Sequence, residues 1–274
     1  MREDTAQSID AFHRGQFHVV QPKGRGHRSG MDAMVLAALV ADERPVRVAD
    51  LGAGAGAAGM AVASRLEKSE VVLFERSHEM AEFARRSLAL PQNAHFSGRV
   101  SVVEADVTLT GKMRNEIGLA DDSFHHVIMN PPFNDAGDRR TPDQLKAEAH
   151  AMIEGLFESW IRTAGAIMIP GGQLSLIARP QSIAEIIAAC GRRFGGIEIT
   201  SIHPRNGEDA VRILVTAIKG SRARLSLRAP LVMHDEGTHK FSAFVDDLNN
   251  GRAAYARRLT GTTLTSRRRS PPAA

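Results

Sequence analysis

The residues best suited to chemistry are a run of four, Asn130-Pro131-Pro132-Phe133, which directly follows an apolar stretch from Phe124 to Met129. The apolar stretch predicts a buried strand, so the four residues lie where that strand ends. An Asn followed by two prolines offers a side-chain carbonyl and a backbone carbonyl on a stiff chain, because proline has a fixed φ and no N–H. Two such acceptors suit a planar NH2 group. The structural alternative is a strand-terminating turn, since Asn-Pro is a common turn signal.

A glycine-rich turn, Asp50-Leu-Gly-Ala-Gly-Ala-Gly56, follows an earlier predicted strand. Gly52, Gly54 and Gly56 would let the backbone of a strand-to-helix turn approach a ligand closely, as in nucleotide-binding α/β sheets. Continued to Gly59, the stretch also matches the G-x-G-x-x-G dinucleotide pattern, which leaves a nicotinamide or flavin cofactor open. Asp50 favours a cationic nucleoside sulfonium instead, because its charge would oppose a pyrophosphate.

Acidic residues at the ends of the next two predicted strands could complete a nucleoside site. Glu75, at the end of the second strand, can accept hydrogen bonds from both hydroxyls of a ribose. Asp106 ends the third strand and can accept from an adenine amino group, while the backbone N–H of Val107 faces a ring nitrogen. Glu104 competes with Asp106 for this role from the opposite face of the strand.

Strands and helices alternate from residue 46 onward, which predicts an α/β fold with a parallel, doubly wound sheet covered on both faces. No helix separates the last two strands, so they are expected to be antiparallel neighbours. We expect Asp32 to cap the first helix. The predicted strands span residues 46–50, 70–75, 100–105, 124–130, 173–178, 196–202 and 210–218, and the predicted helices span 33–41, 57–66, 77–88, 145–164 and 181–190.

The composition indicates one domain with extensions in a reducing compartment. The 274 residues are 43% hydrophobic and 24% charged, enough for one sizeable core. A single cysteine, Cys190, argues against a disulfide framework, and nothing in the sequence predicts a metal site. Without a membrane-length apolar run or an export signal, we expect a cytoplasmic protein with no membrane partner and no obligate protein partner. The expected parts are an N-terminal extension at 1–45, the main domain at 46–219 and a basic, partly disordered extension at 220–274.

The net charge of +4 is unevenly distributed along the chain. The segment from Lys219 to the C-terminus holds 11 Lys/Arg and four Asp/Glu, so it carries +7 and the remainder carries −3. A basic end on a mildly acidic body predicts a polyanionic partner.

The order of these motifs resembles class I S-adenosylmethionine-dependent methyltransferases that modify adenine N6 or glutamine amides. The run Asn130-Pro-Pro-Phe133 at the fourth strand is the most specific part of that resemblance. A wider match is similar to the tRNA1(Val) adenine N6-methyltransferase group over roughly residues 12–240. The resemblance implies a seven-stranded Rossmann-like sheet with its last strand antiparallel, S-adenosylmethionine as cofactor, S-adenosylhomocysteine as product, and an adenine of a tRNA as acceptor. The wider match comprises Gly26-His-Arg28-Ser-Gly-Met-Asp32-Ala, Arg139, Arg140 and Lys146, Ile202-His-Pro-Arg205 and Lys219-Gly-Ser-Arg222-Ala.

The resemblance also implies roles for individual residues. Asn130 and the Pro131 carbonyl would accept both hydrogens of the adenine amine, with Pro132 stiffening the chain and Phe133 stacking on the base. The implied cofactor-binding residues are Asp50, Gly52, Gly54, Gly56, Glu75, Asp106, Val107 and Asn130. The candidate RNA-binding residues are Arg28, Arg139, Arg140, Lys146, Lys219 and Arg222. Within this set, Arg28 could instead pair with Asp32 at a helix start, and the cations after Phe133 could be a solvated loop face.

Three other functions remain open at this point. A protein glutamine-amide methyltransferase shares the Asn-Pro-Pro-aromatic run, although those enzymes usually carry Tyr where this chain has Phe133. They also carry an N-terminal recognition domain, for which about 45 residues before the first sheet strand leave little room. A nicotinamide-dependent oxidoreductase would rest on the glycines of the turn. A noncatalytic RNA-binding module is disfavoured by the intact Asn130 and Glu75.

Overall fold

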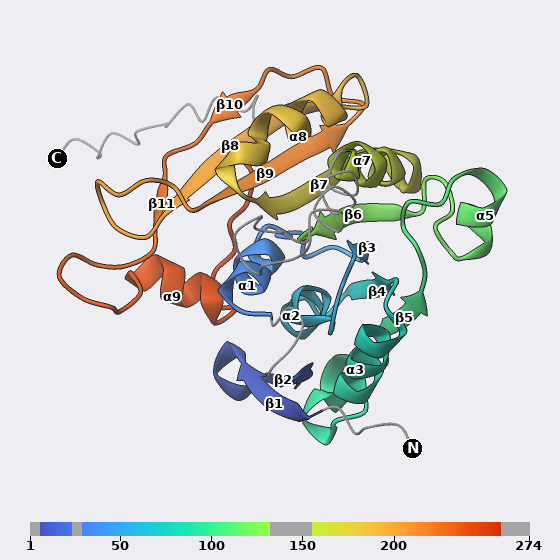
Figure 1. The fold of residues 1–274 in the computed structure, drawn as a ribbon, viewed down its shortest axis with the longest axis horizontal. Coiled ribbons are helices and arrows are strands. Elements are labelled where there is room, and N and C mark those ends of the chain that lie inside the picture. The colour runs from blue at the N-terminus through green and yellow to red at the C-terminus, as the bar shows by residue number, and fades with distance from the viewer. Residues whose placement is uncertain (1–5, 24–28, 132–154, 259–274) are drawn as a thin grey trace, which may run out of the picture.

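The computed structural model describes residues 6–23, 29–131 and 155–258. Its centre is a mixed β-sheet in the order β5-β4-β3-β6-β7-β9-β8 (Figure 1). Strand β9 runs antiparallel to both of its neighbours, and two short strands, β10 and β11, add to β8. The predicted doubly wound sheet with an antiparallel last strand is therefore confirmed. The strands of this sheet are β3 (Val46–Leu51), β4 (Ser69–Glu75), β5 (Val100–Glu104), β6 (Phe124–Met129), β7 (Met168–Ala178), β8 (Phe194–His203), β9 (Arg212–Lys219), β10 (Ser226–Leu227) and β11 (Leu231–Val232).

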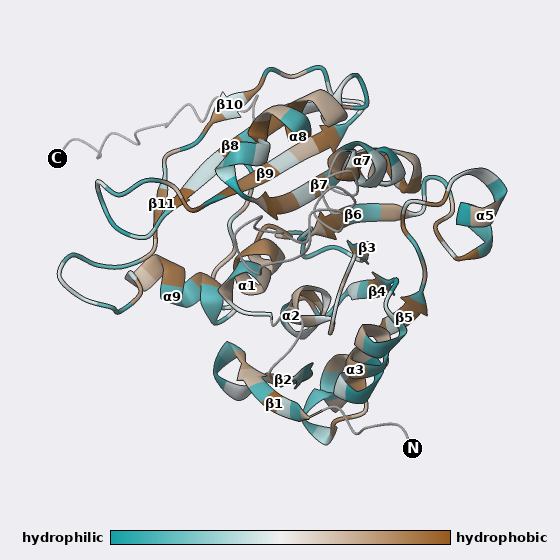
Figure 2. Cartoon of the chain, viewed as in Figure 1, coloured by the Kyte–Doolittle hydropathy of each residue, from teal (hydrophilic) through white to brown (hydrophobic). Residues whose placement is uncertain are grey.

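Helices cover both faces of the sheet, because its central strands are apolar on both sides. Helices α1, α2 and α3 pack on one face and helices α7 and α8 on the other, each over its own hydrophobic cluster (Figure 1). Figure 2 shows hydrophobic segments on β7, β9 and α8. The helices are α1 (Met31–Ala38), α2 (Ala57–Arg65), α3 (His78–Leu88), α4 (Ala94–Ser97), α5 (Gly111–Glu116), α7 (Leu156–Ile167), α8 (Ile183–Cys190) and α9 (Ala243–Asn249), with 3-10 turns at His13–Gly15, Pro91–Asn93 and Pro180–Ser182. None of these helices is both long and apolar enough to cross a bilayer.

The start of α1 differs from the prediction. The helix begins at Met31 with Gly30 at its N-cap, and Asp32 lies inside the first turn. Asp32 does not cap the helix because its carboxylate accepts a hydrogen bond from Arg212 Nε of β9, 2.8 Å away. Helix α3, by contrast, has a side-chain cap, since Ser77 at its N-cap accepts a hydrogen bond at Oγ from the Met80 N–H.

An N-terminal hairpin, β1 (Gln7–Phe12) and β2 (Phe17–Pro22), packs against the first helical layer. The inner edge of β2 has no strand partner, and side chains satisfy its backbone instead. Val20 N donates to Ser87 Oγ at 2.8 Å, and His18 N donates to Asn93 Oδ1 at 2.9 Å. Phe17 is fully buried and its ring meets that of Phe96 edge-on. The hairpin is thus an integral part of the core.

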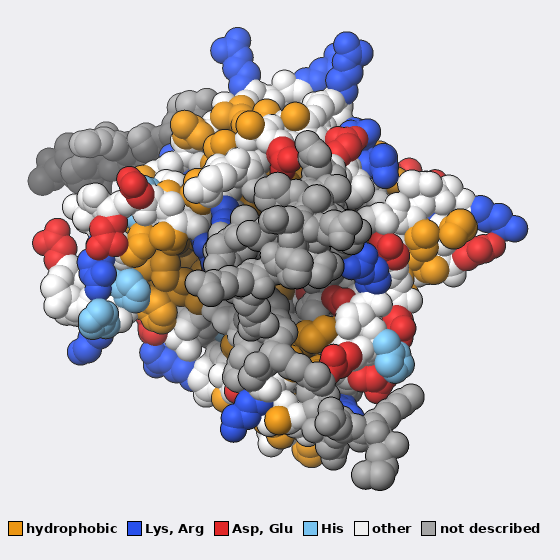
Figure 3. Space-filling model, in the orientation of Figure 1, with side chains coloured by type: hydrophobic (Ala, Val, Ile, Leu, Met, Phe, Trp, Pro, Cys, Tyr) orange, Lys and Arg blue, Asp and Glu red, His pale blue; other side chains and the backbone are white. Residues whose placement is uncertain are grey.

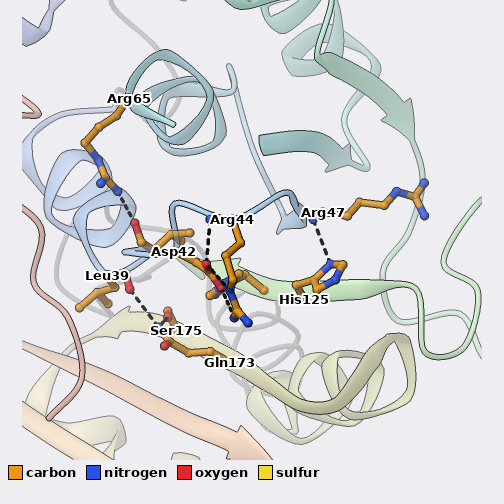
Figure 4. Close-up of polar contacts among 10 residues, drawn as sticks. Leu39, Asp42, Arg44, Arg47, Arg65, His125, Gln173 and Ser175 are labelled. Carbon is orange, nitrogen blue, oxygen red and sulfur yellow. Dashed lines mark hydrogen bonds and ion pairs between the residues drawn. The ribbon is translucent and has the colours of Figure 1, made fainter. Parts of the chain in front are cut away.

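The C-terminal end of α1 is fixed by polar contacts drawn in Figure 4. Gln173 Nε2 donates to the Leu39 carbonyl at 2.9 Å, and the Arg65 guanidinium donates to the Val40 carbonyl. These contacts satisfy carbonyls that a helix end leaves without intrahelical donors. Because one partner comes from β7 and the other from α2, helix α1 is held in place between the sheet and its neighbouring helix.

We expect Phe17→Ala to lower the free energy of unfolding by about 3 to 5 kcal/mol, the usual cost of emptying a fully buried phenylalanine site. Urea denaturation followed by circular dichroism measures it. Ile9→Ala in the same hairpin is the matched control, because Ile9 is 55% exposed and its loss should cost less than about 0.5 kcal/mol. Equal losses for the two variants would contradict a core role for the hairpin.

Candidate active site

A cavity of about 680 Å³ opens at the carboxyl ends of β3, β4, β5 and β6, where ligands bind in open α/β sheets. Strands β3 and β6 are paired so that Leu51 faces Met129, which brings the residues that follow them side by side. The described residues that line the cavity are Ser29, Ala33, Asp50, Gly52, Ala53, Gly54, Ala55, Ala58, Phe74, Glu75, Arg76, Ser77, Glu79, Met80, Ala105, Asp106, Val107, Thr108, Asn130, Gly155, Leu156, Ser159 and Trp160.

The glycine turn forms one wall of the cavity, and its glycines serve two purposes. Gly52 has a φ of +70°, and a Cβ on it would lie 2.3 Å from Cη2 of Trp160, so the indole packs directly on its backbone. Gly54 also lines the cavity with a positive φ. Gly56, at the N-cap of α2, instead lies against the side chains of Leu73 and Met60 and is not among the lining residues. Two of the three predicted glycines therefore face the cavity.

Glu75 is held at the end of β4 by two backbone donors. Its Oε2 accepts from Gly54 N at 2.8 Å and its Oε1 from Ser77 N at 2.7 Å. A carboxylate has about four lone-pair positions, so each oxygen can accept a further bond from a diol. The carboxylate is thus oriented before any ligand arrives, in agreement with its predicted ribose role.

Asp50 is almost completely buried, with 2% of its surface exposed. Its Oδ2 accepts from Gly59 N at 2.9 Å in the first turns of α2, a structural task that the sequence did not reveal. The pKa of Asp50 is raised to about 7, mainly because burial disfavours its charged form and to a lesser extent because of the charge of Glu75, while the Gly59 hydrogen bond acts in the opposite direction. Ionisation of Asp50 beside the charged Glu75 therefore costs free energy at neutral pH, and a bound cation would reduce that cost.

Strand β5 ends at Glu104, so Asp106 lies in the loop that follows it and not at the strand end where it was expected. Asp106 Oδ1 accepts from both N and Oγ1 of Thr108, which leaves Oδ2 without a hydrogen-bond partner among the described residues. Thr163 Oγ1 on α7 donates to the Val107 carbonyl at 2.7 Å and fixes that backbone. Glu104, the competing acid, is exposed and pairs with His78 Nδ1 at 2.8 Å. The lining of the cavity by Asp106 and Val107 supports them over Glu104.

Asn130 lies next to Gly52 at the end of β6 and also lines the cavity. Its Oδ1 is shielded from solvent and has no hydrogen-bond partner within residues 6–23, 29–131 and 155–258. A buried carbonyl oxygen left without a donor costs about 1 to 3 kcal/mol, so such groups call for an explanation. A ligand N–H would supply the missing donor. Pro131 is buried beside it, whereas Pro132 and Phe133 lie outside the described residues.

Sequence reasoning missed the contribution of α7 and α3 to the cavity. Trp160 of α7 is only 8% exposed and packs in the second hydrophobic cluster, but it also lines the cavity. Met80, at the first turn of α3, approaches Gly54 from the other side. A helical apolar pattern could not separate these residues from ordinary core positions, because both belong to buried helix faces.

The two predicted RNA-binding cations that the structure describes, Lys219 and Arg222, do not lie at the cavity. Because β9 runs antiparallel to β7, its last residue, Lys219, lies at the end of the sheet opposite to the cavity. There Lys219 Nζ contacts Asp122 Oδ1 at 2.7 Å and the Met168 carbonyl oxygen at 2.5 Å. Arg222 follows it on that far edge. These two residues therefore cannot contact a group bound at Asn130. The other four candidates, Arg28, Arg139, Arg140 and Lys146, lie outside the described residues.

Comparison with known proteins identifies the class. Residues 30–202 match the family described as the methyltransferase small domain, and the chain belongs to this family. It is therefore an S-adenosylmethionine-dependent methyltransferase. Among curated relatives, the tRNA1(Val) (adenine(37)-N6)-methyltransferase of Shewanella sediminis is 25% identical over 175 residues, covering 64% of this chain and 68% of the relative. The enzyme of the same name from Shewanella baltica is 27% identical over 207 residues, covering 74% and 82%.

Solved structures agree on the fold. A protein of Agrobacterium tumefaciens described as "a predicted O-methyltransferase" is 69% identical, with a TM-score of 0.74, covering 83% of this chain and all of that one. The Thermus thermophilus 16S rRNA N2 G1207 methyltransferase, solved with AdoMet and guanosine, is 19% identical with a TM-score of 0.52, covering 78% of this chain and 50% of that one. At that identity the likeness supports the fold alone.

The residues present fit S-adenosylmethionine. Glu75 could accept hydrogen bonds from a ribose diol, and Asp50 and Glu75 could supply negative charge for a sulfonium. Asp106 Oδ2 has no hydrogen-bond partner among the described residues. Gly54 leaves space beside its backbone at the cavity, whereas the space beside Gly52 is filled by the Trp160 ring, which forms part of the cavity wall. The Asn130 side-chain oxygen, unpartnered in the described part of the chain, would mark the acceptor side. The cofactor supplies the electrophilic methyl group.

We expect Gly52→Ala to weaken S-adenosylhomocysteine binding by about tenfold or more, because the added Cβ meets the Trp160 ring at a positive φ. Isothermal titration calorimetry measures the affinity. Gly98→Ala is the matched control, since a Cβ there meets open space. Unchanged affinity in Gly52→Ala would contradict the placement of the cofactor on this turn.

A second prediction concerns pH. The folded-state pKa of Asp50, about 7, lies above its ordinary value of 3.8. Between these two values the folded state holds the Asp50 proton and the unfolded state does not. The contribution of Asp50 to the free energy of unfolding is therefore fully present below about pH 4 and is lost as pH rises through 7. The Asp50→Asn variant removes the titrating group, so its stability relative to the wild type should increase from pH 4 to pH 7 and then level off. Urea denaturation at stepped pH values measures this difference, and a difference independent of pH would refute the buried titration.

Proposed function

We propose that this methyltransferase transfers the methyl group of S-adenosylmethionine to the exocyclic N6 amine of an adenine in a tRNA. The observation that carries the proposal is the buried Asn130 Oδ1, which has no hydrogen-bond partner among the described residues and lies beside the glycine turn. An N–H of an amine would satisfy this oxygen, and the register of β3 and β6 would then hold that nitrogen close to the methyl donor.

The chemistry of the acceptor explains why such an oxygen is useful. The lone pair of the N6 amine is delocalised into the purine ring, which makes the nitrogen a poor nucleophile. Hydrogen bonds from its two N–H groups to Asn130 Oδ1 and to the Pro131 carbonyl would direct the lone pair out of the ring plane. The interaction strengthens as positive charge develops on nitrogen, so it stabilises the transition state more than the ground state. Phe133 would stack on the base in this arrangement.

The acceptor is proposed to be RNA on the strength of the relatives. The curated enzymes that align with about three quarters of the chain carry names specifying tRNA and adenine N6. An adenine in a tRNA loop can leave its stack at a modest cost, which makes it accessible to an enclosed site. The basic C-terminal segment is consistent with a polyanionic substrate.

Oxygen is the alternative acceptor that a comparison names, because the 69% identical protein is described as "a predicted O-methyltransferase". A hydroxyl acceptor has one hydrogen and needs a base to remove it as it reacts. The unpartnered group beside the cofactor turn is instead the Asn130 amide oxygen, which is a weak base and a good acceptor for N–H. This difference favours nitrogen. Nucleoside analysis of the product separates N6-methyladenosine from 2′-O-methylated nucleosides.

We expect Asn130→Ala to reduce methyl transfer to tRNA by about 100- to 1,000-fold, the range seen when one preorganised transition-state hydrogen bond is removed. The affinity for S-adenosylhomocysteine should stay within about threefold, because the cofactor contacts outside Asn130 remain. Single-turnover transfer of a labelled methyl group measures the rate, and calorimetry the affinity.

The control for this substitution is Asn115→Ala on the exposed α5, which should leave the rate unchanged. An Asn130→Ala enzyme that retains activity within a fewfold of the wild type would remove Asn130 from its proposed role. A wild-type enzyme that binds cofactor but methylates no tRNA from cells lacking the enzyme would contradict the proposed substrate.

A further inference from the structure

Two segments that are far apart in the sequence form a basic edge on the molecule. Pairing of β8 with β9 places Phe194 opposite Lys219, so residues 191–196 and 219–228 meet at the edge of the sheet remote from the cavity. The two segments together contain six Lys or Arg residues and no Asp or Glu. Figure 3 shows Lys and Arg side chains projecting from the end of the molecule where Figure 1 places α8 and the strands that follow it.

Half of these cations already have acidic partners. Arg193 lies 3.2 Å from Glu158, Lys219 lies 2.7 Å from Asp122, and Arg228 lies 3.7 Å from the buried Glu198. The remaining three are exposed and have no acidic partner in the described part of the chain. We call this set the arginine face; it consists of Arg192, Arg222 and Arg224.

The arginine face borders a hollow of about 510 Å³. Arg192 and Arg222 line it together with Gly191, Gly195 and Ser221. The two segments approach so closely that a Cβ on Gly195 would lie 2.2 Å from the Ser221 carbonyl oxygen. The two guanidinium groups therefore belong to segments with a fixed relative position, and such groups suit the bidentate contacts that arginine makes to phosphate oxygens.

We propose that the arginine face binds the phosphate backbone of the RNA substrate at a point separate from the methylated adenine. This inference rests on the proposed function and adds a second contact to it. Strand β9 runs from the end of the sheet that holds the cavity to the end that holds the arginine face. Its eight residues span about 25 Å, which sets the approximate distance between these two ends. Only an RNA longer than this distance can reach both the cavity and the arginine face, so the face would favour a folded tRNA over a short fragment.

An extended polyanion fits the arginine face better than a single small anion does. Three exposed cations without partners each offer a modest, screened attraction, which becomes effective only when several phosphates are bound at once. The hollow is open and contains no buried polar side chain in its lining, so it lacks the enclosure expected of a site for a free phosphate.

The test uses the full-length triple variant Arg192→Ala, Arg222→Ala, Arg224→Ala. The control is Arg86→Ala, Lys112→Ala, Arg252→Ala, which removes the same charge from exposed positions on α3, on α5 and after α9. Each protein is titrated with a full-length tRNA substrate and with a short hairpin that carries only the methylated loop, over a range of KCl concentrations.

We expect the triple variant to bind full-length tRNA at least about tenfold more weakly at low salt. The slope of log K against log salt concentration should fall in magnitude by about 2 to 3, from three lost phosphate contacts. Methylation of the short hairpin and the affinity for S-adenosylhomocysteine should stay within about twofold. The control variant should resemble the wild type in both assays.

Several outcomes would overturn the inference. Unchanged tRNA affinity and salt slope in the triple variant would remove the arginine face as a contact, and so would an equal loss for the short hairpin. Preferential binding to vesicles of anionic lipid, abolished by the triple variant while tRNA binding persists, would assign the face to a membrane surface. If the wild-type enzyme methylates neither RNA, the proposed function itself is contradicted. The wild-type enzyme is therefore assayed first, before any variant.

Discussion

The pairing of β3 with β6 is the constraint on which the site depends. Because Leu51 faces Met129 across these parallel strands, the first residues beyond them, Gly52 and Asn130, end on the same edge of the sheet and beside each other. In the proposed function, the turn that Gly52 begins would face the cofactor, and the segment that Asn130 begins would face the acceptor. Donor and acceptor would then be brought together by backbone hydrogen bonds of buried central strands, which are the least deformable part of a fold.

The surroundings of this junction prepare it electrostatically. Glu75 is oriented by two backbone N–H groups, whereas Asp50 is buried with a raised pKa and a single backbone donor. A sulfonium bound between them would stabilise charges that are costly in its absence, and transfer of the methyl group would remove that benefit, because the product thioether is neutral. The carboxylates that attract the cationic cofactor would thus bind its neutral product less strongly.

Much of the fold could be predicted from the sequence, since apolar runs and turn residues indicated the alternating strands and helices of a doubly wound sheet and the antiparallel pairing of the last two predicted strands. The positions of several side chains could not. Asp32 has the residue type of an N-cap, but a long-range partner, Arg212, competes for its carboxylate. Trp160 lies on an apolar helix face, which does not distinguish it from a core residue, and only the folded structure shows that it packs on Gly52 and lines the cavity. The position of Lys219, in contrast, could have been predicted, because an antiparallel β9 already implies that its last residue lies away from the site.

The most direct test of this account is a crystal structure of the enzyme with S-adenosylhomocysteine and an RNA that contains the target adenine. The account predicts that Asn130 Oδ1 lies within hydrogen-bond distance, about 2.7 to 3.2 Å, of the adenine N6, with N6 pointing toward the sulfur. A structure in which Asn130 Oδ1 instead accepts from a protein group, while a hydroxyl or another nitrogen faces the sulfur, would contradict it.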